Sequence, residues 1–298
     1  MRIGIFGGEG SVQTIVDAAT AAEADGFDSF WLPQIFGTDA MSALTVVGRE
    51  VPRIELGTAV VPTFPRHPLV MAAQALTVSA ASGGRFTLGI GLSHQMVIES
   101  MFGYSFDKPA RHMREYLEVL GPVLSGQPVD MVGETVTARA TIDVPDSEPV
   151  PVLVAALGPL MLNLAARLAA GTVTWMTGPR TLGEHTVPTI TAAAEAGGFS
   201  APRIVSALPV AVTDDAAHAR ERAAAVFQVY GFLPSYRAML DKEGAAGPAD
   251  VALVGTKAEV RAGIESIRDA GATDFVAVEF HGSGAVHADT RDVLREFL

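Results

Sequence analysis

One histidine stands where a strand-like run gives way to a turn, and it is the first candidate for acid–base chemistry. The apolar run 86–92 is followed by Ser93 and His94, and Gly89 and Gly91 would let a planar molecule approach the backbone. An imidazole titrates near neutral pH, so His94 could take or supply a proton at this position. The alternative is that His94 only caps the helix expected after it.

Two Gly-Pro pairs, Gly158-Pro159 and Gly178-Pro179, each lie between a strand-like run and a helix-like run. Backbone N–H groups at a helix start, together with the helix dipole, suit a bound phosphate group. Arg180 follows the second pair and would add a positive charge. The alternative is that both pairs are ordinary turns that begin a helix.

The other polar residues indicate less specific chemistry. We expect Glu279, near His281 at the end of the last strand-like run, to face outward, and His112 and Arg114 to lie on a solvated helix face. The histidines show no His-Glu-x-x-His spacing and the chain has no phosphate-binding P-loop. A zinc hydrolase and a nucleoside-triphosphate enzyme are therefore not indicated, and we expect no metal site.

Short β-branched or aromatic runs alternate with alanine-rich runs of helical spacing. Strands are expected at 2–7, 29–33, 56–62, 86–92, 150–157, 171–176, 203–212 and 274–280. Helices are expected at 11–25, 40–51, 68–82, 110–125, 159–170, 181–196, 214–243, 256–270 and 289–297, with Ser11 and Asp214 as N-caps. Alternation of this kind predicts an α/β fold with a parallel sheet, and eight strands are what a (β/α)8 TIM barrel requires.

Two long gaps between the expected strands predict insertions after strand 4 and strand 7. The first contains 133–142, which alternates like a strand and predicts a hairpin. The second is helical and carries Phe227, Tyr230, Phe232 and Tyr236, which could cover the barrel mouth or pack against its wall. No linker divides the chain, so we expect one domain over 1–298.

A dinucleotide-binding fold is the rival architecture, and its fingerprint fails. Gly8-Glu9-Gly10 follows the first strand, but Gln13 stands where the third glycine belongs. The second strand ends at Trp31-Leu32 without the acid that would bind a ribose.

The amino-acid composition limits the classes of molecule that we expect the chain to bind. The 298 residues include 33 acids, 21 bases and no cysteine, for a net charge of -12. This balance argues against nucleic-acid and anionic-membrane partners and favours a small-molecule substrate. Absence of cysteine removes disulfides and thiol chemistry and fits a cytoplasmic address. The first residues do not resemble a signal peptide, and the apolar stretch 149–166 is too short to span a bilayer.

The region between strands 3 and 4 closely resembles the bacterial luciferase-like superfamily, in its branch that uses the deazaflavin coenzyme F420. The resemblance rests on Leu-Gly-Thr-Ala-Val-Val-Pro-Thr-Phe-Pro-Arg-His-Pro at 56–68 and Ser-Gly-Gly-Arg-Phe-Thr-Leu-Gly-Ile-Gly at 82–91. The words at 30–34, 155–159 and 174–179 resemble coenzyme loops of that branch. The similarity covers nearly the whole chain.

The resemblance implies coenzyme F420, a homodimer and a set of site residues. A cis peptide would fall at Ala59-Val60, behind the deazaflavin ring, and 91–94 would border the ring, with His94 as the catalytic proton donor. Further positions would hold the ribityl phosphate side chain. The implied coenzyme-binding residues are Gly7, Gln34, Ala59, Val60, Val61, Gly91, Leu92, Ser93, Ala156, Leu157, Gly158, Pro159, Met176, Thr177, Gly178 and Arg180.

One departure from the branch bears on the reaction. Related sugar-phosphate dehydrogenases carry an Asp-His pair after strand 2, whereas this chain has Pro33-Gln34. Without that base, the resemblance implies reduction of a small organic acceptor by F420H2 rather than oxidation of an alcohol. An FMN-dependent monooxygenase and a non-catalytic flavin- or deazaflavin-binding barrel remain the alternatives.

Overall fold

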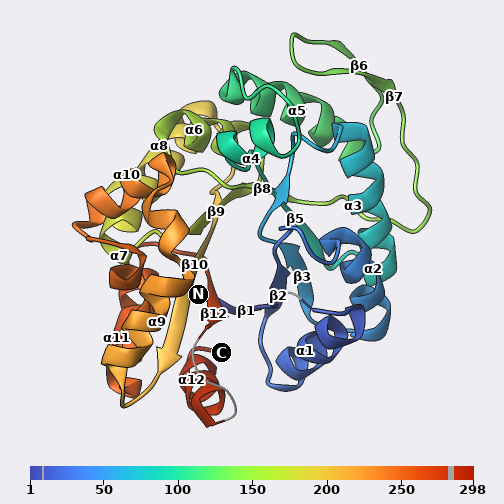
Figure 1. The fold of residues 1–298 in the computed structure, drawn as a ribbon. Helices are drawn as coiled ribbons and strands as arrows, with labels where there is room; N and C mark the ends of the chain where they lie inside the picture. The colour runs from blue at the N-terminus through green and yellow to red at the C-terminus, as the bar shows by residue number, and fades with distance from the viewer. Residues whose placement is uncertain (9, 281–284) are drawn as a thin grey trace.

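The computed structural model describes residues 1–8, 10–280 and 285–298, and its centre is a closed parallel barrel (Figure 1). The barrel strands are β1 (Arg2–Phe6), β2 (Ser29–Leu32), β3 (Glu55–Thr58), β4 (Val61–Pro62), β5 (Phe86–Gly91), β8 (Val152–Val154), β9 (Gly171–Trp175), β10 (Arg203–Val212) and β12 (Asp274–Glu279). Pairing of β9 with β10 and of β12 with β1 closes the sheet. The predicted (β/α)8 TIM barrel is confirmed.

Two strand predictions differ from the structure. The run expected at 56–62 is two segments, β3 and β4, because Ala59 and Val60 are joined by a cis peptide bond that interrupts the strand. A short strand that was not predicted, β11 (Leu253–Gly255), pairs with the end of β10.

The helices surround the sheet (Figure 1). They are α1 (Val12–Ala24), α2 (Ala40–Glu50), α3 (Pro68–Ser82), α4 (Gln95–Ser100), α5 (Pro109–Leu124), α6 (Pro159–Leu168), α7 (Pro179–Thr181), the π-helical turn η1 (Leu182–Thr186), α8 (Val187–Gly197), α9 (Ala216–Val226), α10 (Pro234–Glu243), α11 (Lys257–Asp269) and α12 (Ala285–Arg295). Two short 3-10 turns are η2 (Gln228–Gly231) and η3 (Pro248–Val251). In the described part of the chain, no helix is both long and apolar enough to cross a membrane.

Helix starts follow the expected capping chemistry with one correction. Ser11 accepts a hydrogen bond from the Thr14 amide and caps α1, as predicted. The N-cap of α9 is Asp215, which accepts from the His218 amide, so the prediction of Asp214 was wrong by one residue. Adjacent aspartates offer the same side chain, so the sequence alone does not distinguish them.

Both predicted insertions are present. After β5, a hairpin of β6 (Val129–Val132) and β7 (Thr137–Ala140) extends beyond α3 and α5 (Figure 1). Its first strand precedes the run 133–142, which supplies the turn and the second strand. After β10, the expected single helix is broken into α9, η2 and α10.

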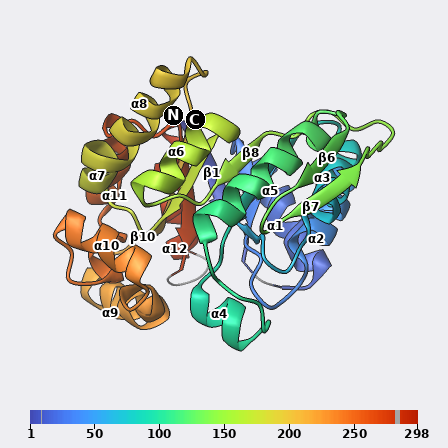
Figure 2. The same cartoon turned by 90° about the horizontal axis from the view of Figure 1, so that it is seen from above.

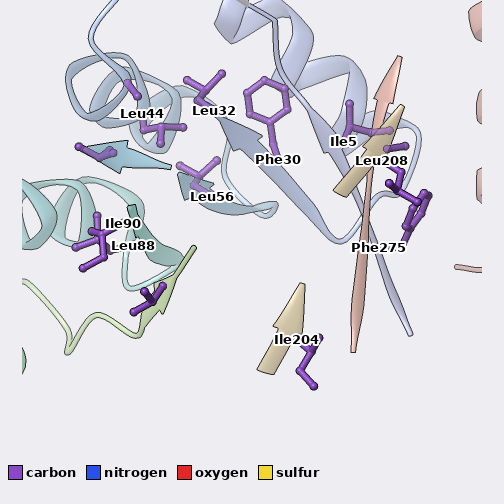
Figure 3. Packing of buried hydrophobic residues seen from close by; sticks show 14 of the residues in the cluster. Ile5, Phe30, Leu32, Leu44, Leu56, Leu88, Ile90, Ile204, Leu208 and Phe275 are labelled. Carbon is purple, nitrogen blue, oxygen red and sulfur yellow. The ribbon is translucent and has the colours of Figure 1, made fainter. Parts of the chain in front are cut away.

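Strand β2 shows how the sheet separates two cores. Phe30 and Leu32 both turn to the outer side of the sheet, and Leu44 of α2 lies beside Leu32 (Figure 3). Between them Trp31 points into the barrel, fully buried against Val173, Val205 and other small or branched side chains. The alternation of side chains along a strand thus places one bulky ring in the barrel interior.

An ion cluster closes the amino-terminal end of the barrel below Trp31. Arg203 Nη1 lies 2.6 Å from Glu55 Oε1, and its Nη2 lies 2.5 Å from Asp274 Oδ1. The guanidinium is also 5.6 Å from the Trp31 ring centre. Burial alone would raise the pKa of Glu55, but the hydrogen bond and charge of Arg203 outweigh it and lower that pKa. Glu55 therefore stays charged and paired with the arginine.

His112 corrects one sequence prediction. It was expected on a solvated face of α5, but it is 8% exposed, its Nε2 lies 3.0 Å from Thr63 Oγ1, and its ring stacks 4.0 Å from that of Phe64. Arg114 is solvated, as expected. Burial lowers the pKa of His112 to about 4, although the nearby Glu115 carboxylate opposes the shift.

The buried imidazole predicts a pH dependence of stability. In the unfolded chain His112 takes up a proton below about pH 6.5, whereas the folded protein resists protonation down to about pH 4. Its contribution to stability is complete above pH 6.5 and falls by about 2 kcal/mol between pH 7 and pH 5. Urea unfolding at the two pH values should show a smaller pH effect for His112→Gln than for the wild type. An equal pH effect in His112→Gln would refute this, and His218→Gln, at an exposed position, is the control.

Candidate active site

The carboxyl ends of the parallel strands meet at one end of the barrel, where α4, α9 and α10 also lie, opposite the chain termini (Figure 2). Five side chains pack over the interior cluster that contains Trp31 and form a floor at this end. The floor residues are Phe6, Ala59, Val60, Ala155 and Trp175. A floor of apolar side chains at the mouth of a TIM barrel is suited to a flat organic ligand.

Two glycines of β5 allow this floor to form. A Cβ on Gly89 would lie 1.9 Å from the carbonyl oxygen of Thr58. A Cβ on Gly91 would lie 2.8 Å from Val60 Cγ2 and 3.3 Å from the Ala155 Cβ. The backbone of β5 can therefore approach its neighbours only because these side chains are missing.

The expected cis peptide bond at Ala59-Val60 is confirmed, and hydrogen bonds hold it to β2. The Ala59 amide donates to the carbonyl of Leu32 at 2.8 Å, and the Gln34 amide donates to the carbonyl of Val60 at 3.4 Å. Gln34 Oε1 accepts from the Ala40 amide at 2.8 Å. The side-chain oxygen of Gln34, which was expected at the coenzyme, thus caps the start of α2.

His94 stands at the rim of the floor. It follows Ser93, whose φ of 60° is in the left-handed region, and it occupies the N-cap position of α4. Its side chain makes no capping hydrogen bond, so the alternative of a helix-capping imidazole is wrong. The ring centre lies 5.8 Å from that of Tyr236 on α10. Burial lowers the pKa of His94, which keeps the imidazole neutral at pH 7.

The two Gly-Pro pairs differ in the structure. Gly158 is the N-cap of α6 and provides no side-chain acceptor for the first amides of that helix. At Gly178 the equivalent position is filled: Glu243 accepts from the amides of Arg180 at 3.2 Å and Thr181 at 2.7 Å. A Cβ on Gly178 would lie 2.3 Å from Glu243 Cδ, so the glycine admits this carboxylate.

The remaining expected residues lie at the same strand ends. Val61 pairs with Ile90 in the sheet, and Leu92 packs on the outer core. The side chains of three further residues are buried: Ala156, Met176 and Thr177. The Leu157 carbonyl lies 2.9 Å from His185 Nε2. Pro159 begins α6, and Arg180 pairs with Glu184 at 3.2 Å. A Cβ on Gly7 would lie 2.4 Å from Phe30 Cζ, so this glycine serves packing beneath the helices.

Aromatic residues of the second insertion do reach the mouth. Phe227 and Tyr230 lie 5.5 Å and 5.8 Å, centre to centre, from Trp175, whereas Phe232 is 76% exposed. Phe6 was not predicted as a site residue, and Trp175 was included only within the coenzyme-loop stretch 174–179, although both lie near the ends of predicted strands. Glu279 pairs with Arg291 of α12 and does not join the site, and His281 lies outside the described residues.

Comparison with known proteins identifies the family. A family model described as luciferase-like monooxygenase matches residues 2–274. A Mycobacterium tuberculosis protein that carries the name coenzyme F420-dependent oxidoreductase is 30% identical over 268 residues, 84% of this chain and 75% of the relative.

Solved structures share the fold. Coenzyme F420-dependent tetrahydromethanopterin reductase from Methanopyrus kandleri has a TM-score of 0.82 and 23% identity, covering 98% of this chain and 97% of that chain. The oxygenating constituent of 3,6-diketocamphane monooxygenase from Pseudomonas putida, in complex with FMN, has a TM-score of 0.77 and 16% identity, covering 99% and 97%. With the match to the family model, these findings confirm the sequence resemblance: the chain belongs to the luciferase-like monooxygenase family.

Proposed function

We propose that this protein is a coenzyme F420-dependent oxidoreductase that reduces a small organic acceptor. The observation that carries the proposal is the floor around Val60, Gly91 and Ala155, where one added methyl group at Gly91 would meet two neighbours. The named M. tuberculosis relative supports F420 over other coenzymes.

The residues present fit both parts of such a coenzyme. The apolar floor suits a flat tricyclic ring, because such a ring gains from contact with small and aromatic side chains. The uncapped start of α6 at Gly158 suits the phosphate, since its first amides have no side-chain acceptor. The start of α7 would accept a phosphate only if Glu243 moved away. We therefore propose that the phosphate binds at α6 and that Arg180, which pairs with Glu184 in this structure, adds a positive charge.

The chain itself would orient the ligand and manage one proton. A bound deazaflavin supplies hydride chemistry at its C5 atom, while the protein contributes binding, orientation and exclusion of water. His94 is held at the rim by the left-handed turn at Ser93, and no capping bond engages its ring. It is the residue we propose to exchange a proton with the substrate.

An FMN-dependent monooxygenase is the second candidate, because an FMN complex is among the structures with this fold. A barrel that binds a flavin without catalysis is a third. The identity of the bound coenzyme distinguishes the F420-dependent oxidoreductase from the FMN-dependent monooxygenase. Measurable turnover distinguishes either enzyme from a barrel that only binds a flavin.

Fluorescence titration of the purified protein with F420 and, separately, with FMN tests the proposal. We expect F420 to bind more tightly than FMN, and Gly91→Ala to weaken F420 binding at least tenfold by displacing Val60, a loss of about 1.4 kcal/mol. Gly121→Ala on α5 is the matched control, because a Cβ there meets nothing within 4 Å. Tight FMN binding without F420 binding would overturn the proposal.

The titration of His94 provides a second test. Since burial lowers its pKa, the imidazole should gain its proton below about pH 6.5, and any step that needs the imidazolium should speed up as the pH falls toward that value. NMR of the histidine ring protons, assigned with His94→Gln, measures the midpoint. A midpoint at or above 6.5 would contradict burial as the controlling effect.

We also propose that the protein is a homodimer that associates through α3. The whole helix, from Pro68 to Ser82, lacks a charged residue, although Val70 and Thr77 are exposed. A helix that is apolar all round is usually covered on its outer face. Light scattering should give twice the chain mass for the wild type and for Gln13→Arg on α1, and the monomer mass for Thr77→Arg. A monomeric wild type would remove the proposal.

A further inference from the structure

A continuous series of aromatic rings, here called the aromatic wall, rises from the floor to His94. Phe6 stacks on Trp175 at 6.5 Å, Trp175 meets Tyr230 at 5.8 Å, Tyr230 meets Tyr236 at 5.0 Å, and Tyr236 meets His94 at 5.8 Å. The five residues come from β1, β9, η2, α10 and the turn after β5. Segments far apart in the sequence thus build one side of the mouth.

The docking of α10 sets the position of Tyr236. At the end of α10, Glu243 accepts the amides of Arg180 and Thr181, and the Met239 carbonyl accepts from the Thr181 hydroxyl at 3.2 Å. These bonds join α10 to α7 about one turn beyond Tyr236, at Met239, and about two turns beyond it, at Glu243. The ring of Tyr236 is therefore held at His94 by contacts remote from the mouth.

Several polar groups of the wall have no protein partner among the described residues; the buried indole Nε1 of Trp175 is one of them, and two more lie at the His94 end of the wall. Within residues 1–8, 10–280 and 285–298, no hydrogen bond engages the Tyr236 hydroxyl or a ring nitrogen of His94. Burial raises the pKa of Tyr236, which keeps the phenol protonated, and lowers that of His94, which keeps the imidazole neutral. No residue of the wall carries a charge at pH 7.

We propose that Tyr236 and His94 together bind the carbonyl oxygen of a neutral, planar, conjugated substrate that lies against the aromatic wall. The phenol of Tyr236 donates a hydrogen bond to that oxygen, and the imidazole of His94, 5.8 Å away in the same wall, donates a second one. A carboxylate of the same shape would lose its hydration without meeting a positive charge, so it should bind more weakly. The inference rests on the proposed function, since the substrate would occupy the same mouth as the coenzyme ring.

The test uses the F420-loaded protein and a matched pair of probes, 2-naphthaldehyde and 2-naphthoate. Calorimetry should show that the aldehyde binds at least tenfold more tightly than the carboxylate to the wild type. Tyr236→Phe removes only the hydroxyl and should weaken aldehyde binding about fivefold to tenfold, the effect of one hydrogen bond between neutral groups. Tyr230→Phe, in the same wall but not in contact with His94, should change it less than twofold.

Each outcome decides between the proposals. F420 fluorescence titration and circular dichroism should be unchanged in both variants, because neither hydroxyl is assigned to the coenzyme or to the fold. Equal or tighter binding of 2-naphthoate by the wild type would overturn the substrate class. Aldehyde binding unchanged in Tyr236→Phe, or reduced equally in both variants, would overturn the role of Tyr236. Absence of F420 binding by the wild type would instead refute the proposed function.

Discussion

The ion cluster around Arg203 is the constraint on which the rest of the barrel depends. It joins β10 to β3 through Glu55 and to β12 through Asp274, so three strands share one guanidinium at the amino-terminal end. Removing one partner of such a buried set would leave an uncompensated charge, which is strongly destabilising. Trp31 lies directly above the arginine and fills the interior. The packed interior separates this ion cluster from the opposite mouth, where the carboxyl ends of the strands meet.

The shape of the mouth depends on glycines, which have no side chain, as much as on the side chains around it. Gly89 and Gly91 bring β5 against β3 and β4, and the space that remains is bounded by methyl groups of Val60 and Ala155. Beside this surface, the second insertion contributes Tyr230, which meets Trp175, and Tyr236. The barrel strands therefore provide a rigid surface for a ring, and the insertion provides the groups that would select what lies on that ring.

Prediction from sequence succeeded where the information is local. The strand ends, the cis bond at Ala59-Val60 and the rim position of His94 follow from motifs a few residues long or from the family resemblance they carry. Prediction failed where a contact with a residue distant in the sequence determines the position of a side chain. His112 has the helical spacing of a surface residue, and only Thr63 and Phe64, which precede α3, show that it is buried. Asp214 and Asp215 are chemically equal, and only the hydrogen bond from the His218 amide shows that Asp215 is the cap.

The two Gly-Pro pairs show the same limit at the site itself. Both begin a helix after a barrel strand, and both present the amides that an anion requires. What separates them is Glu243, more than sixty positions beyond Gly178, which the second insertion returns to the start of α7. The carboxylate satisfies those amides and at the same time anchors α10, the helix that carries Tyr236. One helix start is thus used to hold α10 in place, and the first amides of the other have no side-chain acceptor in the part of the chain that the structure describes. The two Gly-Pro pairs therefore differ in role, because Glu243 binds the amides that follow Gly178 and no described side chain binds those that follow Gly158.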